Sequence, residues 1–311
     1  MRLESRCMDD SIENAVLSVL RYYVIFNYPL KADEIFGNLS IICPFSELLV
    51  TLEDMKEAES LYMHKGYFSL DANIKEQVLR RKDANSLANE KKVKALAVGK
   101  FIYKFPFVRF VGISGSLSKG YADQKSDFDF FIVTEKNRLW ICRTLLHLFK
   151  KTTFLFGQQH KFCMNYFIDM HNMQLEEQNR FTAIELSSMI PAAGSEVYTL
   201  LMNNNLWVSN HLPNGYVRGD DDKNNAVVKG GLFKALLEIV ANISFPGKMN
   251  ILLMRITDAK WRKKWARKNF PEEDYNVAFK TTPHISKNHP ANHQKRVLTV
   301  LSKFEDKNLS V

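Results

Sequence analysis

Apolar residues recur at intervals of three and four along the first part of the chain. Over residues 10–26 this spacing predicts an amphipathic helix, and Pro29 breaks the pattern. The same reasoning predicts a short second helix over 31–39 and a third over 45–58, which turns leucine and methionine side chains inward. The segment LYMHKGYFSL then predicts a small hairpin that turns at Lys65-Gly66. The N-terminal part is therefore expected to be three helices and a hairpin.

These elements are the parts of a winged helix, so we expect a winged-helix-like module at residues 1–72. Many such modules bind DNA through their third helix, but here that helix is acidic. Phosphates repel acidic side chains, and affinity for DNA depends on Lys and Arg. We therefore do not expect this module to bind duplex DNA. Against the single Lys56, the stretch 45–60 holds these acids: Glu47, Glu53, Asp54, Glu57 and Glu59.

The middle of the chain alternates between strand-like and helix-like patterns. A polar, Lys-rich stretch predicts a helical connector at 73–106. Apolar runs of strand length follow at 108–114, 127–133 and 161–169, with an amphipathic helix between the last two at 137–151. This order indicates an α+β fold with a small mixed sheet. We expect it in a domain at 107–207.

The rest of the chain reads as a basic, helical C-terminal region at 208–311. The segment 208–229 lacks periodicity and is rich in Asn, Asp and Gly, which predicts a loop. Of the formal net charge of +9 over 311 residues, most lies in 245–311, where 14 Lys and Arg oppose 6 Asp and Glu. Such a basic end suits an anionic partner such as a nucleotide or RNA, or is simply a solvated helix face.

Several classes of protein do not fit the composition. No apolar run reaches the roughly 18 residues of a membrane span, and the N-terminus lacks the apolar core of a signal peptide. We therefore expect no membrane span and a cytoplasmic protein. The four cysteines are scattered, which favours free thiols over zinc or disulfides. A His-containing stretch from Lys280 to His293 lacks acidic partners, so it suggests a phosphate- or acceptor-facing loop rather than a metal site.

Two acids, Asp127 and Asp129, stand on a strand that is otherwise apolar. Because residues i and i+2 of a strand face the same way, the two carboxylates are expected side by side. Such a pair is costly to bury without a cation, and hard oxygen ligands suit Mg²⁺ or Mn²⁺. Upstream, the turn at Gly115-Ser116 could offer backbone N–H groups to phosphates. The pattern therefore predicts a metal-and-phosphate site.

The arrangement Ser114-Gly115-Ser116, ten residues, then Asp127-Phe128-Asp129-Phe130 resembles the signature of the DNA polymerase β-like nucleotidyltransferase superfamily. The match covers about residues 108–169. It departs from the superfamily at Ser114, where an apolar residue is usual. The resemblance implies a nucleotidyltransferase domain with two metal ions, an NTP and a hydroxyl acceptor.

The resemblance also implies roles for individual residues. Gly115 and Ser116 would bind the triphosphate, Asp127 and Asp129 would hold metal and be catalytic, and a third carboxylate on a neighbouring strand would help hold one ion. Asp169 is the only acid on the strand 161–169 and is expected to fill that role, with Asn165 as the alternative. Lys119 is expected to contact phosphate or else to be solvated. Weaker phosphate-binding candidates lie on the following helix, at Arg138 and Arg143.

Three functions stay open at this point. The first is a Mg²⁺-dependent enzyme that moves a nucleoside monophosphate from an NTP, such as ATP, to a hydroxyl of a small molecule, protein or RNA. The second is a regulator that senses nucleotide, or binds DNA or protein, with an inactive nucleotidyltransferase-like domain. The third is a toxin-type nucleotidyltransferase that a partner controls. A complete set of metal ligands favours the first, and a missing carboxylate favours the second.

Overall fold

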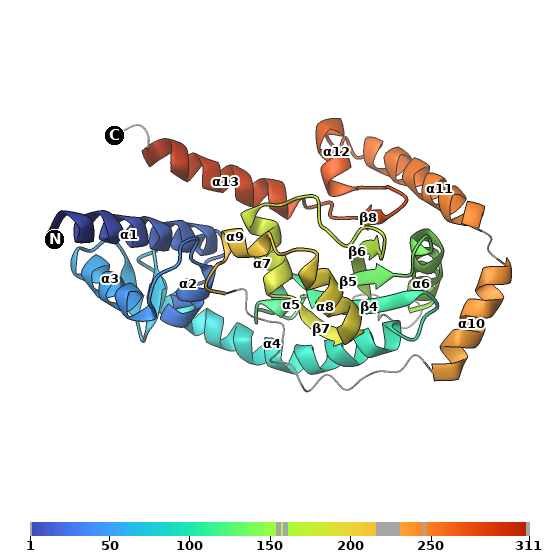
Figure 1. Cartoon of the computed structure of the whole chain (residues 1–311), viewed down its shortest axis with the longest axis horizontal. Coiled ribbons are helices and arrows are strands. Elements are labelled where there is room, and N and C mark those ends of the chain that lie inside the picture. The colour runs from blue at the N-terminus through green and yellow to red at the C-terminus, as the bar shows by residue number, and fades with distance from the viewer. Residues whose placement is uncertain (1, 154–156, 158–160, 216–230, 245–246, 309–311) are drawn as a thin grey trace.

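The structure, a computed structural model, describes residues 2–153, 157, 161–215, 231–244 and 247–308 (Figure 1). Its N-terminal part follows the predicted order of three helices and a hairpin. A short strand also joins the hairpin to make a three-stranded sheet of order β1-β3-β2. Lys65 and Gly66 both have positive φ angles, as a two-residue hairpin turn requires. The elements are α1 (Arg2–Val24), β1 (Leu30–Lys31), α2 (Ala32–Asn38), α3 (Phe45–Glu57), β2 (Tyr62–His64) and β3 (Tyr67–Ser69).

The predicted connector is one long helix, α4 (Ile74–Ile102), which runs along the base of the molecule in Figure 1. Its first turns pack on the hairpin through Ile74 and Val78. Its later alanines enter the core of the central sheet. Gly99 allows the closest approach, because a Cβ there would lie 2.6 Å from the Cβ of Ala192. The helix therefore fixes the N-terminal module against the sheet.

The central sheet has five strands in the order β7-β4-β5-β6-β8. β5 and β6 are parallel and α6 connects them, whereas the other neighbours are antiparallel. The structure thus confirms the mixed α+β class. The elements are β4 (Val108–Ser114), α5 (Gly115–Ser118), β5 (Asp129–Thr134), α6 (Leu139–Thr153), β6 (Cys163–Asp169), β7 (Ile190–Ala193) and β8 (Ile285–Lys287).

Helices cover both faces of this sheet. One face packs against α4 and α6, with Phe130, Ile132 and Phe167 pointing to them. The other face, with Phe131 and Val133, packs against a group of shorter helices and Tyr22 of α1. These elements are α7 (Arg180–Ser187), α8 (Ser195–Asn203), α9 (Val208–His211) and α13 (His293–Asn308), the last of which lies beside α1 in Figure 1.

The C-terminal region differs from its prediction in two ways. It contributes β8 to the edge of the central sheet, beside β6, so it is not helical throughout. The segment predicted as a loop at 208–229 begins with α9, and its part from 216 onward lies outside the described residues. The remaining helices are α10 (Gly231–Ser244), α11 (Gly247–Ala266) and α12 (Glu272–Ala278).

No single helix in the described ranges is both long enough and apolar enough to cross a membrane. Only α10 and α11 taken together reach such a length and composition, and they are bent by 87° at the break between them.

Candidate functional site

The sheet brings the Gly-Ser turn and the two aspartates together. β4 ends at Ser114, and its antiparallel pairing with β5 sets Ser114 opposite Asp129. Gly115 then leaves the sheet into α5, directly beside the carboxylate of Asp129. Asp127 lies two residues before β5 and outside it, so the predicted strand begins two residues later than expected. Gly115 and Asp129 therefore lie side by side at this end of the sheet.

Gly115 is needed for two reasons. Its φ of +70° lies in the left-handed region, which costs an L-residue about 1–2 kcal/mol. A Cβ at this position would also lie 2.8 Å from Oδ2 of Asp129. Ser116 follows on α5 and is exposed. The backbone at Gly115 thus lies close to Oδ2 of Asp129, and Ser116 lies at the surface.

Asp129 carries an unfavourable charge in this environment. Burial raises the pKa of its carboxyl to about 6, and the neighbouring charge of Asp127 contributes to this rise, as does Glu185 more weakly. A hydrogen bond with Cys163 and the cation Lys119 act in the opposite direction and do not cancel these effects. Ionised Asp129 is therefore less favourable here than in water, and a bound cation would offset this cost.

Asn165 holds the other oxygen of Asp129. Its Nδ2 donates to Oδ1 of Asp129 over 3.0 Å, while its Oδ1 lies 3.5 Å from Sγ of Cys163. The pairing of β5 with β6 shifts register between Phe130 and Phe131, and Asn165 is the residue without a partner in this bulge. The amide therefore occupies the position on β6 next to the aspartates.

Lys119 lies at the site and is not free in solvent. Its Nζ donates to the carbonyl of Gly115 over 3.1 Å and to Oε1 of Glu185 over 2.6 Å. Glu185 comes from α7, and no spacing in the sequence pointed to it. The residue stands among Ile184, Leu186 and other core side chains of a short helix, so only the fold places its carboxylate here.

Hydrogen bonds from the N-terminal module and α4 hold the loop between Lys119 and Asp127. The hydroxyl of Tyr28 donates to the carbonyl of Lys119, and Asn85 of α4 donates to that of Gly120. Nζ of Lys91, also on α4, donates to the carbonyls of Asp123, Gln124 and Ser126 at 2.7–3.2 Å. The N-terminal module and α4 thus fix the loop that carries Asp127 to the sheet.

Asp169 is not part of this site, which corrects the sequence prediction. β5 and β6 are parallel, and their register pairs Asp129 with Cys163 but Asp169 with Thr134. Asp169 therefore lies six residues further along β6, about 20 Å from that end. It also follows the alternation of Phe167, which faces α6, whereas Asp129 shares the opposite face with Phe131.

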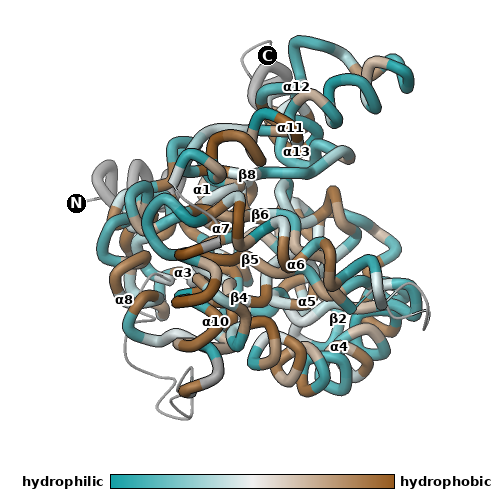
Figure 2. The backbone as a smooth tube through the Cα atoms, turned by 90° about the vertical axis from the view of Figure 1, so that its right-hand side faces the viewer, coloured by the Kyte–Doolittle hydropathy of each residue, from teal (hydrophilic) through white to brown (hydrophobic). Residues whose placement is uncertain are grey.

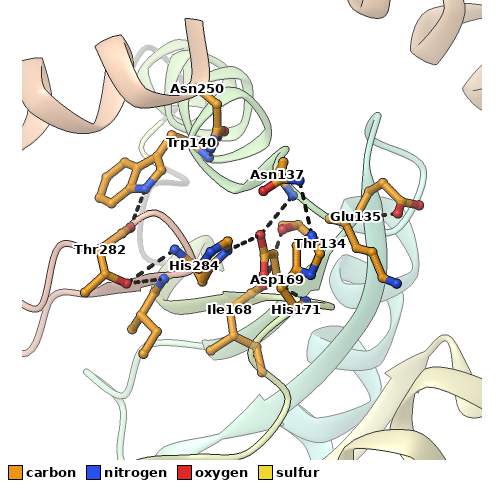
Figure 3. A network of polar contacts seen from close by, with 12 residues as sticks. Thr134, Glu135, Asn137, Trp140, Ile168, Asp169, His171, Asn250, Thr282 and His284 are labelled. Atoms are coloured by element: carbon orange, nitrogen blue, oxygen red, sulfur yellow. Dashed lines mark hydrogen bonds and ion pairs between the residues drawn. The ribbon is translucent and has the colours of Figure 1, made fainter. Parts of the chain in front are cut away.

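Instead, Asp169 is a buried structural acid (Figure 3). Its carboxylate accepts the backbone N–H of Asn137 over 2.9 Å and that of His171 over 3.0 Å. Nδ1 of His284 lies 2.9 Å from Oδ2. These contacts join the β5–α6 loop, the end of β6 and the segment before β8. Asp169, at the end of its strand, therefore holds three chain segments together.

The weaker candidates are also placed elsewhere. The guanidinium of Arg138 lies over the ring of Phe107, and that of Arg143 is buried with the ring of Trp261 4.6 Å away. The His-containing stretch packs onto the sheet edge. Lys280 there pairs with Glu176, and burial lowers the pKa of His289 to about 4. These side chains have structural contacts away from the aspartate pair.

The acids of the site suit a hard divalent cation. Asp127 lies close enough to Asp129 for its charge to raise the pKa of that carboxyl, and Asn165 donates its N–H to Oδ1 of Asp129, which orients the carboxylate without adding a ligand. Within the described part of the chain, no three His, Cys, Asp or Glu side chains converge on one point. Mg²⁺ is commonly held by one or two carboxylates together with substrate phosphates, so a two-carboxylate site is sufficient for it.

Comparison of the chain with protein-family models, curated proteins and solved structures found no match in any of the three.

Proposed function

We propose that the chain is a Mg²⁺- or Mn²⁺-dependent nucleotidyltransferase, which moves a nucleoside monophosphate from an NTP to a hydroxyl acceptor and releases pyrophosphate. One observation carries the proposal, namely that the left-handed Gly115 turn lies against the carboxylate of Asp129. This contact puts backbone suited to phosphate next to acids suited to a metal. It is the juxtaposition expected from the resemblance to polymerase β-like nucleotidyltransferases.

Each residue of the site has a task in this proposal. Asp127 and Asp129 would hold the cation, which when bound supplies charge for the triphosphate and for the reacting hydroxyl. Asn165 orients Asp129 through Oδ1 and leaves Oδ2 on the side of Gly115. Lys119 fixes the carbonyl of Gly115 and brings a positive charge toward the phosphate position, with Ser116 at the exposed edge. Glu185 keeps Lys119 in place.

A second function is favoured by one observation, the presence of Asn165 where a third carboxylate was expected. An amide is neutral, so it holds a second ion less well and accepts no proton from the acceptor. A site with two carboxylates would then bind nucleotide with a metal but turn it over slowly or not at all. Such a chain would be a nucleotide sensor, and the measurement of binding and turnover on the same sample separates the two functions.

The direct experiment supplies the full chain with each α-³²P-labelled NTP, Mg²⁺ and a cell lysate, and follows labelled acceptor and pyrophosphate. We expect Asp127→Asn and Asp129→Asn to abolish transfer while the protein stays folded. Asp83→Asn is the matched control, because it removes an exposed acid of α4 far along the chain from the site. Equal, measurable transfer by wild type and Asp129→Asn would refute this site, and absence of transfer by folded wild type would exclude the enzyme.

A further inference from the structure

Helix α10 attaches to the protein by its charged side chains. Nζ of Lys234 donates to the carbonyl of Tyr103 over 2.9 Å. Glu238 accepts from Nη1 of Arg109 over 2.6 Å and from the backbone of Phe107. Ala241, one turn further on, is buried. Because residues i, i+4 and i+7 share a face, α10 turns its polar side inward.

The opposite side of α10 is aliphatic and exposed. Its spacing of three and four residues makes one continuous stripe, and Leu232 and Ile243 are 92% and 79% exposed. Figure 1 shows α10 at the outer edge of the molecule, and Figure 2 looks onto that side and colours most of the helix as hydrophobic. Leu252 and Ile256 are also exposed, one turn apart on α11, which is bent by 87° from α10. We call these residues the outer face: Leu232, Leu236, Ile239, Val240, Ile243, Leu252 and Ile256.

The exposed charges on α11 and just after it are mostly positive. The stretch 231–268 has two acids, Glu238 and Asp258. Glu238 is bound to Arg109, and Asp258 accepts from Arg262 over 2.9 Å. Seven exposed cations remain on and just after α11, with no acid of this stretch left to oppose them: Lys248, Arg255, Lys260, Lys263, Lys264, Arg267 and Lys268.

We propose that the outer face binds the surface of an anionic lipid bilayer. An exposed aliphatic stripe next to a cluster of Lys and Arg is the combination that places a helix in the headgroup region of such a membrane. The helices would lie on the membrane and not cross it. Lys234 and Glu238 are tied to the body of the protein, and α10 meets α11 at 87°.

The positive charge and the aliphatic stripe together argue against two other binding partners for the outer face. A second copy of the chain would bring the same seven cations to a self-complementary interface, where like charges repel. A nucleic acid would use the cations but leave a stripe of five aliphatic side chains on α10 without a partner. An anionic bilayer is the partner that satisfies both the aliphatic stripe and the positive charge.

The test is flotation of the full chain with vesicles of phosphatidylcholine, with and without phosphatidylglycerol. We expect flotation only with the anionic vesicles. Leu236→Asp with Ile239→Asp should lower the bound fraction at least about tenfold. Leu206→Asp is the matched control, since Leu206 is as exposed (61%) as Leu236 (58%) but lies outside the outer face.

The charge is tested in the same assay. Lys263→Glu with Lys264→Glu should abolish flotation, whereas Lys82→Glu with Lys94→Glu on α4, an equal change in net charge, should not. Absence of flotation by the folded wild type overturns the proposal. If wild type does not float but forms a dimer, and Leu236→Asp dissociates that dimer, the outer face is a subunit interface. RNA binding lost with Lys263→Glu, without flotation, would identify it as a nucleic-acid surface.

Discussion

Replacing Asp129 by asparagine should change how the stability of the protein depends on pH. In the folded chain the pKa of Asp129 is raised from 3.8 to about 6, first by burial and then by Asp127. The folded state therefore holds this proton more tightly than the unfolded state. Protonated Asp129 therefore contributes to the free energy of unfolding at low pH, and this contribution is lost as the pH rises through the pKa of the folded state.

The size of the effect follows from the shift. A difference of about 2 pKa units corresponds to about 3 kcal/mol, at 1.36 kcal/mol per unit. The asparagine of the Asp129→Asn variant does not titrate, and its amide oxygen can still accept from Asn165. The variant and wild type should thus be similarly stable near pH 4, and the variant should be more stable by up to about 3 kcal/mol above pH 7.

Urea unfolding of both proteins across this pH range measures the difference. Asp123→Asn is the control of opposite sign, because a hydrogen bond from Ser126 lowers the pKa of Asp123. That variant should be less stable than wild type by an amount that is nearly constant above about pH 5 and shrinks only as the pH falls below 3.8, because Asp123 titrates below the range of Asp129. A stability difference for Asp129→Asn that stays constant with pH, or reverses, would refute the electrostatic account of the pair.

Three further predictions concern neighbouring groups. Gly115→Ala should lower nucleotide affinity and stability more than Gly66→Ala does. Both glycines have positive φ, but only a Cβ at position 115 would contact a carboxylate. Isothermal titration measures the affinities, and urea unfolding measures the stabilities. Glu185→Gln should move the pH midpoint of the Asp129 effect downward, because Glu185 raises that pKa, and an unchanged or higher midpoint would contradict the assignment. Asp169→Asn should destabilise the fold by about 3–5 kcal/mol through a broken buried network, yet leave nucleotide affinity unchanged in the protein that remains folded.

Local patterns in the sequence were sufficient for most elements. The polar, Lys-rich composition located α4, the period of the apolar residues located α6, and Lys65-Gly66 located the hairpin. The edge strands β7 and β8 were not predicted. They have four and three residues, β7 contains Pro191, and neither has enough length for an alternating pattern. Their place in the sheet depends on contacts far along the chain.

In the candidate site, too, local patterns predicted some residues, and contacts far along the chain determined the others. The spacing of Gly115 and Asp129 was informative because one antiparallel pairing of adjacent strands brings them together. The prediction that Asp169 belongs to the site was wrong because it used only the alternation of side chains along one strand. The register of β5 with β6 and the bulge at Asn165 depend on packing, which that alternation does not reveal. Glu185 was missed because its helix reads as ordinary core packing.

The central claim is that Asp127, Asp129 and Gly115 form a metal-dependent nucleotide site and that Asp169 does not belong to it. Isothermal titration of NTP into the full chain, with and without Mg²⁺, tests this most directly. We expect Mg²⁺-dependent binding by wild type and by folded Asp169→Asn, and a loss of at least about tenfold, or 1.4 kcal/mol, in Asp127→Asn and Asp129→Asn. Wild-type affinity in Asp129→Asn, together with loss of binding in Asp169→Asn, would contradict the account.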